Sequence, residues 1–416
     1  MSPLPHSRHA ARVLLLPFLL LAACRREAGQ GSATVQAPSA PAGGSAAAPT
    51  AGAAVELAGR LIVMAADDAA QRNRVLQLDA ATGEWRELWA TSPQGNVTNW
   101  TPAPGGAAVA YRIIQRSSPE DAIEALVVRD LAPGAPARVL AVVDASRNRL
   151  AGFGWAPDGA SIGFGVQALA AEDSGKAAGW SLRAATVGDQ PTALDQAPDG
   201  ASTRLLWQAE EPPDQPLALN LEAFDPGRGR AAVSQLATDS GIIASLRLID
   251  LRAGRALTVL PVTIAGLSPA AGPEALALPE GAPVADSLRL LDLASGQARE
   301  LYRSPTGGSL GRPLWSADGG RLAAAGYPDA TGAGDTEILV LDPAASAGAA
   351  PMRFALPGAA SAPLAFSPDG RWLLVQAGAA DEAFGARPTL LPLAGGAPRA
   401  ASFAVPAGSW AISWLP

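Results

Sequence analysis

The chain contains 416 residues, carries a formal net charge of −7, and is 48% hydrophobic and 17% charged. This composition provides enough apolar material for a folded core, which excludes a disordered chain, and it lacks the basic excess that nucleic-acid binding needs. The only cysteine is Cys24, which excludes internal disulfides and thiolate metal clusters.

The first 23 residues have the pattern of a secretory signal sequence. Two arginines precede an apolar run of 11 residues, Val13–Ala23, whereas a membrane-spanning helix needs about 20. We therefore predict that residues 1–23 are removed during export. Both histidines, His6 and His9, fall in this segment, so we expect no histidine in the mature chain.

The end of this segment, Leu21-Ala22-Ala23-Cys24, resembles the lipobox of bacterial lipoproteins. The resemblance implies that the Cys24 thiol receives diacylglycerol and becomes the new amino terminus, with acyl chains such as palmitate holding the protein on a membrane. Buried acyl chains contribute about 0.8 kcal/mol per methylene, so the anchor needs no transmembrane helix. Arg25 is not the aspartate that marks inner-membrane retention in enterobacterial lipoproteins. The sequence therefore leaves open whether the outer or the cytoplasmic membrane carries the protein.

The lipidated cysteine is followed by a linker, and together they form residues 24–56. Between Ala28 and Ala54 the sequence has no charged and no aromatic residue, so this stretch cannot form a core. A flexible coil of this length spans about 30 Å between its ends. We expect it to hold the folded domain, residues 57–416, away from the lipid surface.

That domain contains a repeated turn motif of the form aromatic-x-Pro-Asp-Gly. Proline presets φ, aspartate bonds its own backbone and glycine accepts positive φ, so the motif closes a tight turn between two strands. The clear copies, each before an apolar strand, are Trp155–Gly159 before Ser161–Phe164, Trp315–Gly319 before Arg321–Ala324, and Phe366–Gly370 before Trp372–Val375. Weaker copies begin at Trp100, Phe224, Leu267 and Trp414. A period of about 50 residues predicts a β-propeller.

A second recurring element is a strand that ends in aspartate ahead of a turn: Val75–Asp79, Leu246–Asp250, Leu288–Asp292 and Ile338–Asp342. The first of these has no turn motif upstream, and the motif at Trp414 has no strand after it. We therefore predict that strands from both ends of the domain complete one blade. The result is an all-β fold, a single propeller of seven four-stranded blades.

These motifs resemble the TolB-like propeller repeats, relatives of the WD-type repeat, over about residues 57–416. The resemblance implies the fold and an address in the cell envelope, and it does not specify a function. TolB itself has an α/β domain ahead of its propeller, where this chain has the linker. The same repeat precedes a catalytic domain in prolyl-oligopeptidase relatives, and we expect no such domain in this chain.

Two glycine-rich segments match catalytic or cofactor motifs by spacing alone. Gly307–Gly311 has the spacing of a nucleophile elbow, but the mature chain lacks a histidine base. Gly163–Ala168 fits a degenerate dinucleotide fingerprint, but it falls in a predicted strand and opens no helix. We interpret the first as a loop between blades and the second as a strand that needs small residues.

The remaining ionisable and aromatic residues are interpreted as structural. Aspartates in turns hydrogen-bond the backbone, which explains Asp158, Asp318, Asp369, Asp79, Asp250, Asp292 and Asp342. Asp67-Asp68 and Glu210-Glu211 are expected in loops, with too few ligands for calcium. Four tryptophans outside the motif, Trp85, Trp89, Trp180 and Trp207, are expected to pack between sheets. Lys176 is placed in a polar loop, and Tyr111, Tyr302 and Tyr327 in or beside strands.

Two functions stay open at this point. The first is a membrane-anchored binding or scaffold module, expected to be monomeric and free of cofactor and metal, that holds a protein, peptide or glycan with the loops around its central channel. The second is a glycosidase or lyase that brings two carboxylates together from different blades. The lack of histidine favours the first, so we name no catalytic residue; the one site residue is the lipidation site, Cys24.

Overall fold

The computed structural model describes residues 57–416, with gaps at 94, 117–121, 171–172, 189–202, 210–217, 237–241, 266–269, 273, 282–283, 306, 328–335, 347, 357–360 and 377–387. The predicted signal segment, Cys24 and the predicted linker, residues 1–56 in all, lie outside the described residues. Within the described residues no helix is both long and apolar enough to cross a membrane.

The described strands form seven four-stranded antiparallel sheets, the blades of a β-propeller. In each blade the strands run in the following order from the innermost to the outermost. Blade 1 contains β28 (Ser409–Leu415), β1 (Arg60–Asp67), β2 (Arg72–Leu78) and β3 (Trp85–Ala90). Blade 2 contains β4 (Gly95–Pro102), β5 (Ala108–Arg116), β6 (Ala122–Asp130) and β7 (Ala137–Asp144). Blade 3 contains β8 (Asn148–Trp155), β9 (Ser161–Ala170), β10 (Asp173–Thr186) and β11 (Thr203–Gln208).

Blade 4 contains β12 (Ala218–Asp225), β13 (Arg230–Leu236), β14 (Ile242–Asp250) and β15 (Arg255–Ala265). Blade 5 contains β16 (Ala270–Ala271), β17 (Ala275–Glu280), β18 (Ser287–Asp292) and β19 (Ala298–Arg303). Blade 6 contains β20 (Leu314–Trp315), β21 (Leu322–Gly326), β22 (Thr336–Leu341) and β23 (Met352–Leu356). Blade 7 contains β24 (Ala362–Phe366), β25 (Trp372–Gln376), β26 (Thr389–Pro392) and β27 (Arg399–Ala400).

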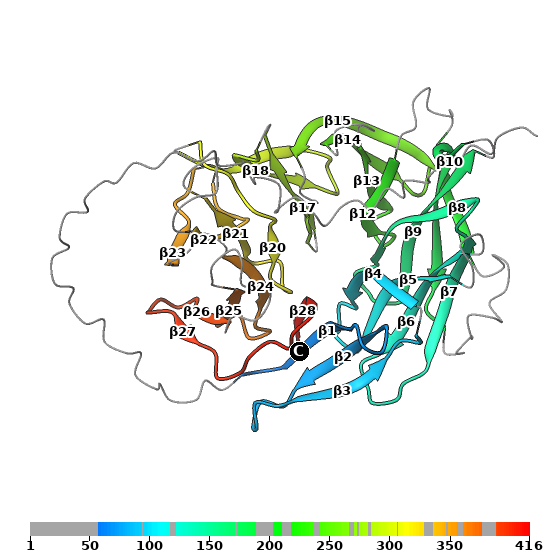
Figure 1. The fold of residues 1–416 in the computed structure, drawn as a ribbon. Coiled ribbons are helices and arrows are strands. Elements are labelled where there is room, and N and C mark those ends of the chain that lie inside the picture. The colour runs from blue at the N-terminus through cyan, green and yellow to red at the C-terminus, as the bar shows by residue number, and fades with distance from the viewer. Residues whose placement is uncertain are drawn as a thin grey trace, which may run out of the picture. The chain divides into compact units, whose positions relative to one another are not determined.

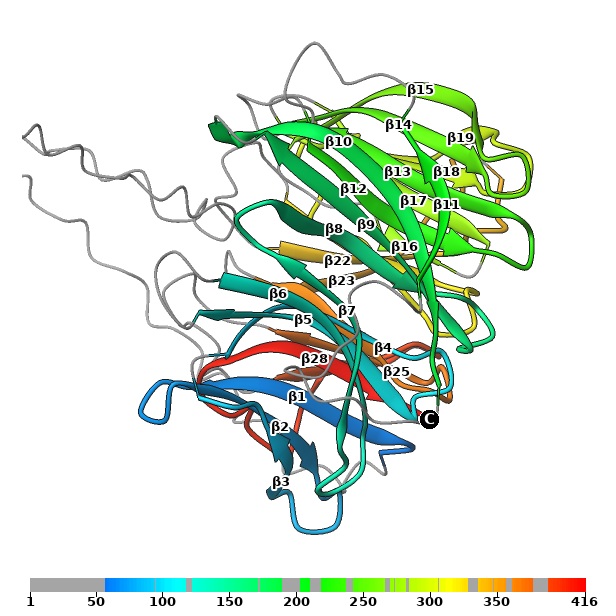
Figure 2. The ribbon, with the colours of Figure 1, turned by 90° about the vertical axis from the view of Figure 1, so that its right-hand side faces the viewer.

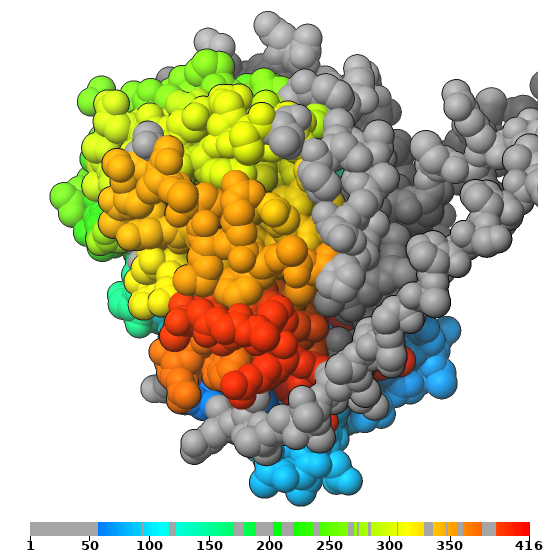
Figure 3. Space-filling model, turned by 90° about the vertical axis from the view of Figure 1, so that its left-hand side faces the viewer, coloured from blue at the N-terminus to red at the C-terminus, as the bar shows by residue number. Residues whose placement is uncertain are grey.

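The first strands of successive blades contact one another, as in the pairs β8 and β12, β12 and β16, β20 and β24, and β24 and β28. These strands therefore surround the propeller axis, and the ribbon shows the blades following each other around it in chain order (Figure 1). Seen from one side, the sheets of blades 2, 3 and 4 stack face against face (Figure 2). The opposite side shows blades 5, 6 and 7 as adjacent yellow, orange and red bands (Figure 3).

The clear turn motifs lie where the sequence places them, between the first two strands of a blade. In blade 3 the Ala156 N–H donates to Ser161 O at 2.9 Å, the Asp158 carboxylate accepts the Ala160 N–H at 2.9 Å, and Gly159 has φ of 69°. The same pattern recurs in blades 6 and 7, where a serine hydroxyl also reaches the turn aspartate. These turns set the hairpin that starts each of these blades.

One of the weaker copies differs from its predicted register, and another lies outside the described residues. In blade 2 the turn runs from Ala103 to Gly106, with the Ala103 N–H donating to Ala108 O, so Pro102 takes the place that Trp155 has in blade 3. Trp100 lies two residues too early to be the equivalent. In blade 5 the copy at Leu267 falls on residues outside the described part, and the first described hairpin joins Ala271 to Leu276 across a shorter turn.

A glycine in β9 lets blade 3 approach blade 4 closely, and a second one makes room within blade 3. A Cβ on Gly163 would lie 2.4 Å from the Phe224 ring of blade 4, and one on Gly165 would lie 2.5 Å from the Trp180 ring and from Ala151 O, both in blade 3. These distances are too short for any larger side chain unless its neighbours move. The segment that mimics a dinucleotide fingerprint is therefore a strand of small residues, as predicted.

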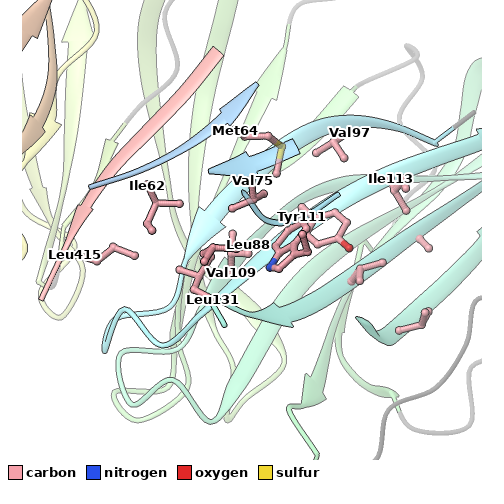
Figure 4. Close-up of a cluster of buried hydrophobic side chains, with 14 residues drawn as sticks. Ile62, Met64, Val75, Leu88, Val97, Val109, Tyr111, Ile113, Leu131 and Leu415 are labelled. Carbon is pink, nitrogen blue, oxygen red and sulfur yellow. The ribbon is translucent and has the colours of Figure 1, made fainter. Parts of the chain in front are cut away.

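The ring is closed by the predicted pairing of the two ends. β28 lies antiparallel to β1 from Arg60 opposite Leu415 onward, and the Trp414 indole N–H donates to Ala58 O at 2.7 Å. Leu415 joins a buried cluster with Ile62 of β1 and Tyr111 of blade 2 (Figure 4). The last strand therefore contributes both backbone pairing and core packing to blade 1.

We predict that deleting residues 410–416 lowers the free energy of unfolding by at least about 4 kcal/mol. The deletion removes two buried core residues, Trp414 and Leu415, each worth about 2–5 kcal/mol, and it leaves the inner edge of β1 unpaired. Thermal melts by circular dichroism measure the effect, and removal of the exposed Pro416 alone is the control. Equal melting temperatures for the deletion and the control would show that the ring is not closed by this strand.

Candidate binding site at the propeller axis

The turn aspartates are structural, as the sequence predicts. Asp79, Asp250, Asp292 and Asp342 each accept backbone N–H groups two or three residues ahead. In blade 6 the Ser316 hydroxyl donates to Asp318 at 2.6 Å, and this bond is the main reason that the pKa of Asp318 lies below its ordinary value. A carboxylate held ionised by such bonds caps its turn and is poorly suited to act as a general acid.

The other acidic and basic candidates do not assemble into a site. Asp67 ends β1 and bonds the Ala70 N–H and Arg72. Glu210-Glu211 lie outside the described residues, and within the described part no three His, Cys, Asp or Glu side chains gather as metal ligands would. Lys176 lies in β10 rather than in the expected loop, because the β9–β10 hairpin extends to Asp173.

The four tryptophans outside the turn motif pack between sheets, as expected. Trp89 of blade 1 stacks on Tyr111 of blade 2 with ring centroids 5.7 Å apart. Trp180 contacts Trp207 of the same blade at 5.5 Å and donates to Leu219 O of blade 4 at 3.1 Å, and both indoles belong to a buried cluster that includes Leu221 of blade 4. Trp85 packs on Phe403 and donates to Ala404 O in blade 7. The tyrosines lie in β5, in β19 and directly after β21. The elbow-like Gly307–Gly311 runs between β19 and β20, and Ser309 O accepts the Tyr327 N–H there.

The sequence gives no signal for Glu222, an ionisable residue on an innermost strand whose environment shifts its pKa. It lies in β12, the innermost strand of blade 4. Its Oε1 accepts the Ser234 hydroxyl at 2.5 Å and the Asn220 amide at 2.9 Å. Burial raises the pKa of this carboxyl, and the two hydrogen bonds and the charge of Arg312 only partly offset that effect.

A β-bulge gives Glu222 its direction. Leu221 pairs with Val233 and Ala223 with Ala232, so Glu222 is the extra residue between two regular pairs. Bulges re-aim a side chain and end regular pairing locally. Similar irregularities interrupt the innermost strands of blades 1, 2, 3 and 7.

Arg312 comes from two blades further along the ring. It lies between Gly311, whose N–H donates to Ala325 O, and β20, so it belongs to the irregular inner strand of blade 6. Its side chain is exposed. The charge of Arg312 lowers the pKa of Glu222, although blade 5 lies between the blades that carry the two residues.

Two charged residues of blade 2, Arg112 and Glu124, form a clamp that holds β8, the inner strand of blade 3. Arg112 of blade 2 donates to Leu150 O at 2.6 Å and to the Thr98 hydroxyl at 2.7 Å, and Glu124 accepts the Leu150 N–H at 2.9 Å. Desolvation lowers the pKa of Arg112, and Glu124 counters it. Next to this clamp, Gly152 fits against Asn220 and Leu221, where a Cβ would come within 2.6–2.7 Å. Blade 2 thus fixes β8, and β8 fixes the strand that carries Glu222.

The raised pKa of Glu222 predicts that the stability of the fold depends on pH. A raised folded-state pKa means that the contribution of the group to stability is fully present below the unfolded pKa, about 4.3, and is lost as the pH rises through the folded pKa. Glu222→Gln keeps an acceptor for Ser234 and cannot ionise. The melting temperature of wild type relative to Glu222→Gln should therefore fall as the pH rises from about 4.3 through the raised folded-state pKa.

The control for this series is Glu87→Gln, which changes a surface glutamate paired with Arg74. The two variants are melted in the same buffers. The melting temperature of wild type is compared with that of Glu222→Gln at each pH. If the difference stays constant, or if wild type becomes the more stable of the two as the pH rises, the carboxyl at this position is not buried as described.

A comparison of the sequence with protein-family models finds no match, and a comparison with curated proteins also finds none.

Among solved structures, the fold is similar to that of a prolyl endopeptidase, with a TM-score of 0.54 and 14% identity over 86% of this chain. The chain spans about half of that enzyme, 49% of its length. It is also similar to a putative 6-phosphogluconolactonase from Bacteroides fragilis, with a TM-score of 0.50 and 12% identity over 85% of this chain and 97% of that protein. TolB from Acinetobacter baumannii superposes with a TM-score of 0.43 and 13% identity over 86% of this chain and 67% of TolB. At these identities the similarity shows the propeller fold alone.

Proposed function

We propose that this protein is a lipoprotein of the bacterial cell envelope whose propeller binds a protein, peptide or glycan at its axis. The observation that carries the proposal is the pair of unlike groups on the inner strands of blades 4 and 6. Glu222 uses Oε1 for Ser234 and Asn220, so Oε2 remains for a ligand. Arg312 is exposed, and a guanidinium group carries five hydrogen-bond donors that can meet an anionic or carbonyl group of a ligand.

The same site supports binding over hydrolysis. A glycosidase needs two carboxyl groups about 5–10 Å apart, and a nearby carboxylate would act on the pKa of Glu222 as a like charge. The groups that act on it are Ser234, Asn220 and Arg312. Two other buried carboxylates in the described part of the chain are already bonded: Glu124 of β6 to the Leu150 N–H, and Asp225 of β12 to Arg228. Glu222 therefore serves better as a hydrogen-bond acceptor than as half of a catalytic pair.

We predict that Arg312→Gln lowers capture of the partner about tenfold or more, which is the effect of removing one desolvated charge contact. The full chain is immobilised, exposed to envelope extract, and the bound proteins and glycans are quantified by mass spectrometry. Arg371→Gln is the matched control, since it changes an arginine in the turn of blade 7 that makes only a 4.0 Å contact with Asp369. Equal capture by both variants would contradict binding at the axis.

A parallel screen on chromogenic glycosides, esters and peptides tests the enzymatic alternative. If the protein only binds its ligand, the rate of hydrolysis should not exceed that measured with an unrelated protein. Reproducible hydrolysis that disappears in Glu222→Gln would replace the binding role with a carboxylate enzyme.

The membrane anchor rests on the lipobox and on Cys24 being the only cysteine. We predict that Cys24→Ser abolishes incorporation of an alkyne-labelled palmitate and releases the protein from the membrane fraction, because no acyl chain can then attach. Cells expressing either form are labelled and fractionated, and the detergent-extractable share is compared. A variant that stays membrane-bound as the parent does would show that the anchor lies elsewhere.

A further inference from the structure

A second candidate site lies away from the axis, in a groove between the outer strands of blades 4 and 5. The groove has a volume of about 530 Å³. Blade 4 contributes the start of β14 and the end of β15, and blade 5 contributes the end of β17, the start of β18 and the end of β19. The two blades are joined at its floor, where the Gly281 N–H donates to Thr263 O at 2.9 Å and forms a parallel bridge with Ile264.

An exposed apolar strip leads into this groove along β15. Within this 11-residue strand the side chains of Thr258, Leu260, Val262 and Ile264 point inward. The alternate residues point outward, and Leu257 and Val259 are 42% and 52% exposed. Pro261 and Thr263 continue the same exposed row and line the groove.

The backbone of β15 is also open for pairing. It is the outermost strand of blade 4, paired with β14 on one side. On its other side, the pairing among described residues is the bridge to Gly281 at Ile264. An edge strand presents unpaired N–H and C=O groups, so the stretch from Thr258 to Leu260, after the register shift at Leu257, can pair with another extended chain.

The charges in the groove leave one carboxylate weakly compensated. Arg289 is committed to Glu280, with distances of 3.0 and 3.1 Å to its two oxygens. Arg303 is committed to Glu300, at 2.7 and 3.1 Å, and reaches Asp286 only at 3.3 and 3.5 Å. Glu280 and Asp286 line the groove together with Arg289 and Arg303, whereas Glu300 lies outside the lining and shares Arg303. The two guanidinium groups thus serve three carboxylates, and Asp286 has the longest contacts of the three.

We propose that β15 and this groove bind an extended peptide segment that adds a strand to blade 4. Its apolar residues lie along Leu257 and Val259, and a lysine or arginine side chain enters the groove beside Asp286. The Gly281 bridge ends the open edge, so the basic residue marks the end of the added strand. Backbone pairing provides affinity, while the strip and the carboxylate provide selectivity. The site is separate from Glu222 and Arg312 and stands whether or not they bind a ligand.

The test uses a fluorescein-labelled hexapeptide amide, Val-Thr-Val-Thr-Val-Lys, titrated with the full chain and followed by fluorescence anisotropy. We expect saturable binding. Asp286→Asn removes a charge contact and should weaken binding about fivefold or more. Val259→Lys places a positive charge on the apolar strip and should weaken binding about tenfold or more. Replacing the peptide lysine with norleucine should weaken binding to wild type and remove the effect of Asp286→Asn. A peptide with proline in place of both threonines cannot pair with an edge strand and should not bind.

Two matched controls separate the site from general surface charge. Leu205→Lys changes a side chain on β11 that is 50% exposed, close to the 52% of Val259, and Glu87→Gln removes a surface carboxylate on blade 1. Both should bind the hexapeptide as wild type does. Absence of saturable binding, equal affinity for the proline peptide, or equal affinity in Val259→Lys and Leu205→Lys would overturn the proposal.

A measurement on wild type alone guards against a variant that misfolds. Hydrogen exchange of residues 255–262 should slow when the hexapeptide is present, because the edge N–H groups become paired. Peptides from β23, the outermost strand of blade 6, should exchange at an unchanged rate. Unchanged exchange of residues 255–262 at saturating peptide would also overturn strand addition.

Discussion

The antiparallel pairing of the last strand with the first is the constraint on which the rest of the molecule depends. A propeller blade cannot bury its two faces by itself, so each sheet relies on a neighbour at either side. Blade 1 contains three strands from one end of the domain and β28 from the other. Without β28, blade 7 and blade 2 would each face an incomplete sheet. The position of every inner strand around the axis follows from this closure.

Between the blades, tryptophan and arginine side chains donate hydrogen bonds to backbone carbonyls of a neighbouring sheet. Trp155 donates to Thr101 O and Trp315 to Ala270 O, each from the inner strand of one blade to that of the preceding one. Arginines that follow a turn glycine do the same: Arg60 reaches Gly106 O and Arg321 reaches Gly370 O. Such bonds satisfy carbonyls that the sheets leave unpaired and fix the angle between neighbouring blades. These hydrogen bonds also give some of the abundant arginines a structural role, which the composition alone does not reveal.

The fold could be predicted from the sequence because a repeated turn is a local signal. Proline, aspartate and glycine at fixed positions determine a hairpin without reference to the rest of the chain, as in Trp155–Gly159. The displaced copy at Trp414 was enough to predict closure. Register was less predictable where the motif is degenerate: Trp100 resembles the anchor more than Pro102 does, yet the backbone hydrogen bonds of Ala103 place Pro102 there.

The candidate sites could not be predicted, because each depends on residues that only the folded ring brings together. Glu222 is one of 38 acidic residues in the chain. Arg312 lies 90 positions further along the sequence, and no motif spacing relates the two residues. Its direction depends on a bulge, for which β12 carries no proline or glycine signal. The groove beside Asp286 likewise needs two blades. What the sequence did indicate correctly was that the aspartates of the turns are structural.

The most direct test of closure is hydrogen exchange measured by mass spectrometry on the intact protein. If β28 completes blade 1, peptides covering residues 409–415 should be protected to the same degree as those covering β1 and the central strand β9, and all should lose protection together in denaturant. If residues 409–415 exchange within seconds while β9 stays protected, the terminal strand is not part of the folded ring and the account of its closure is wrong.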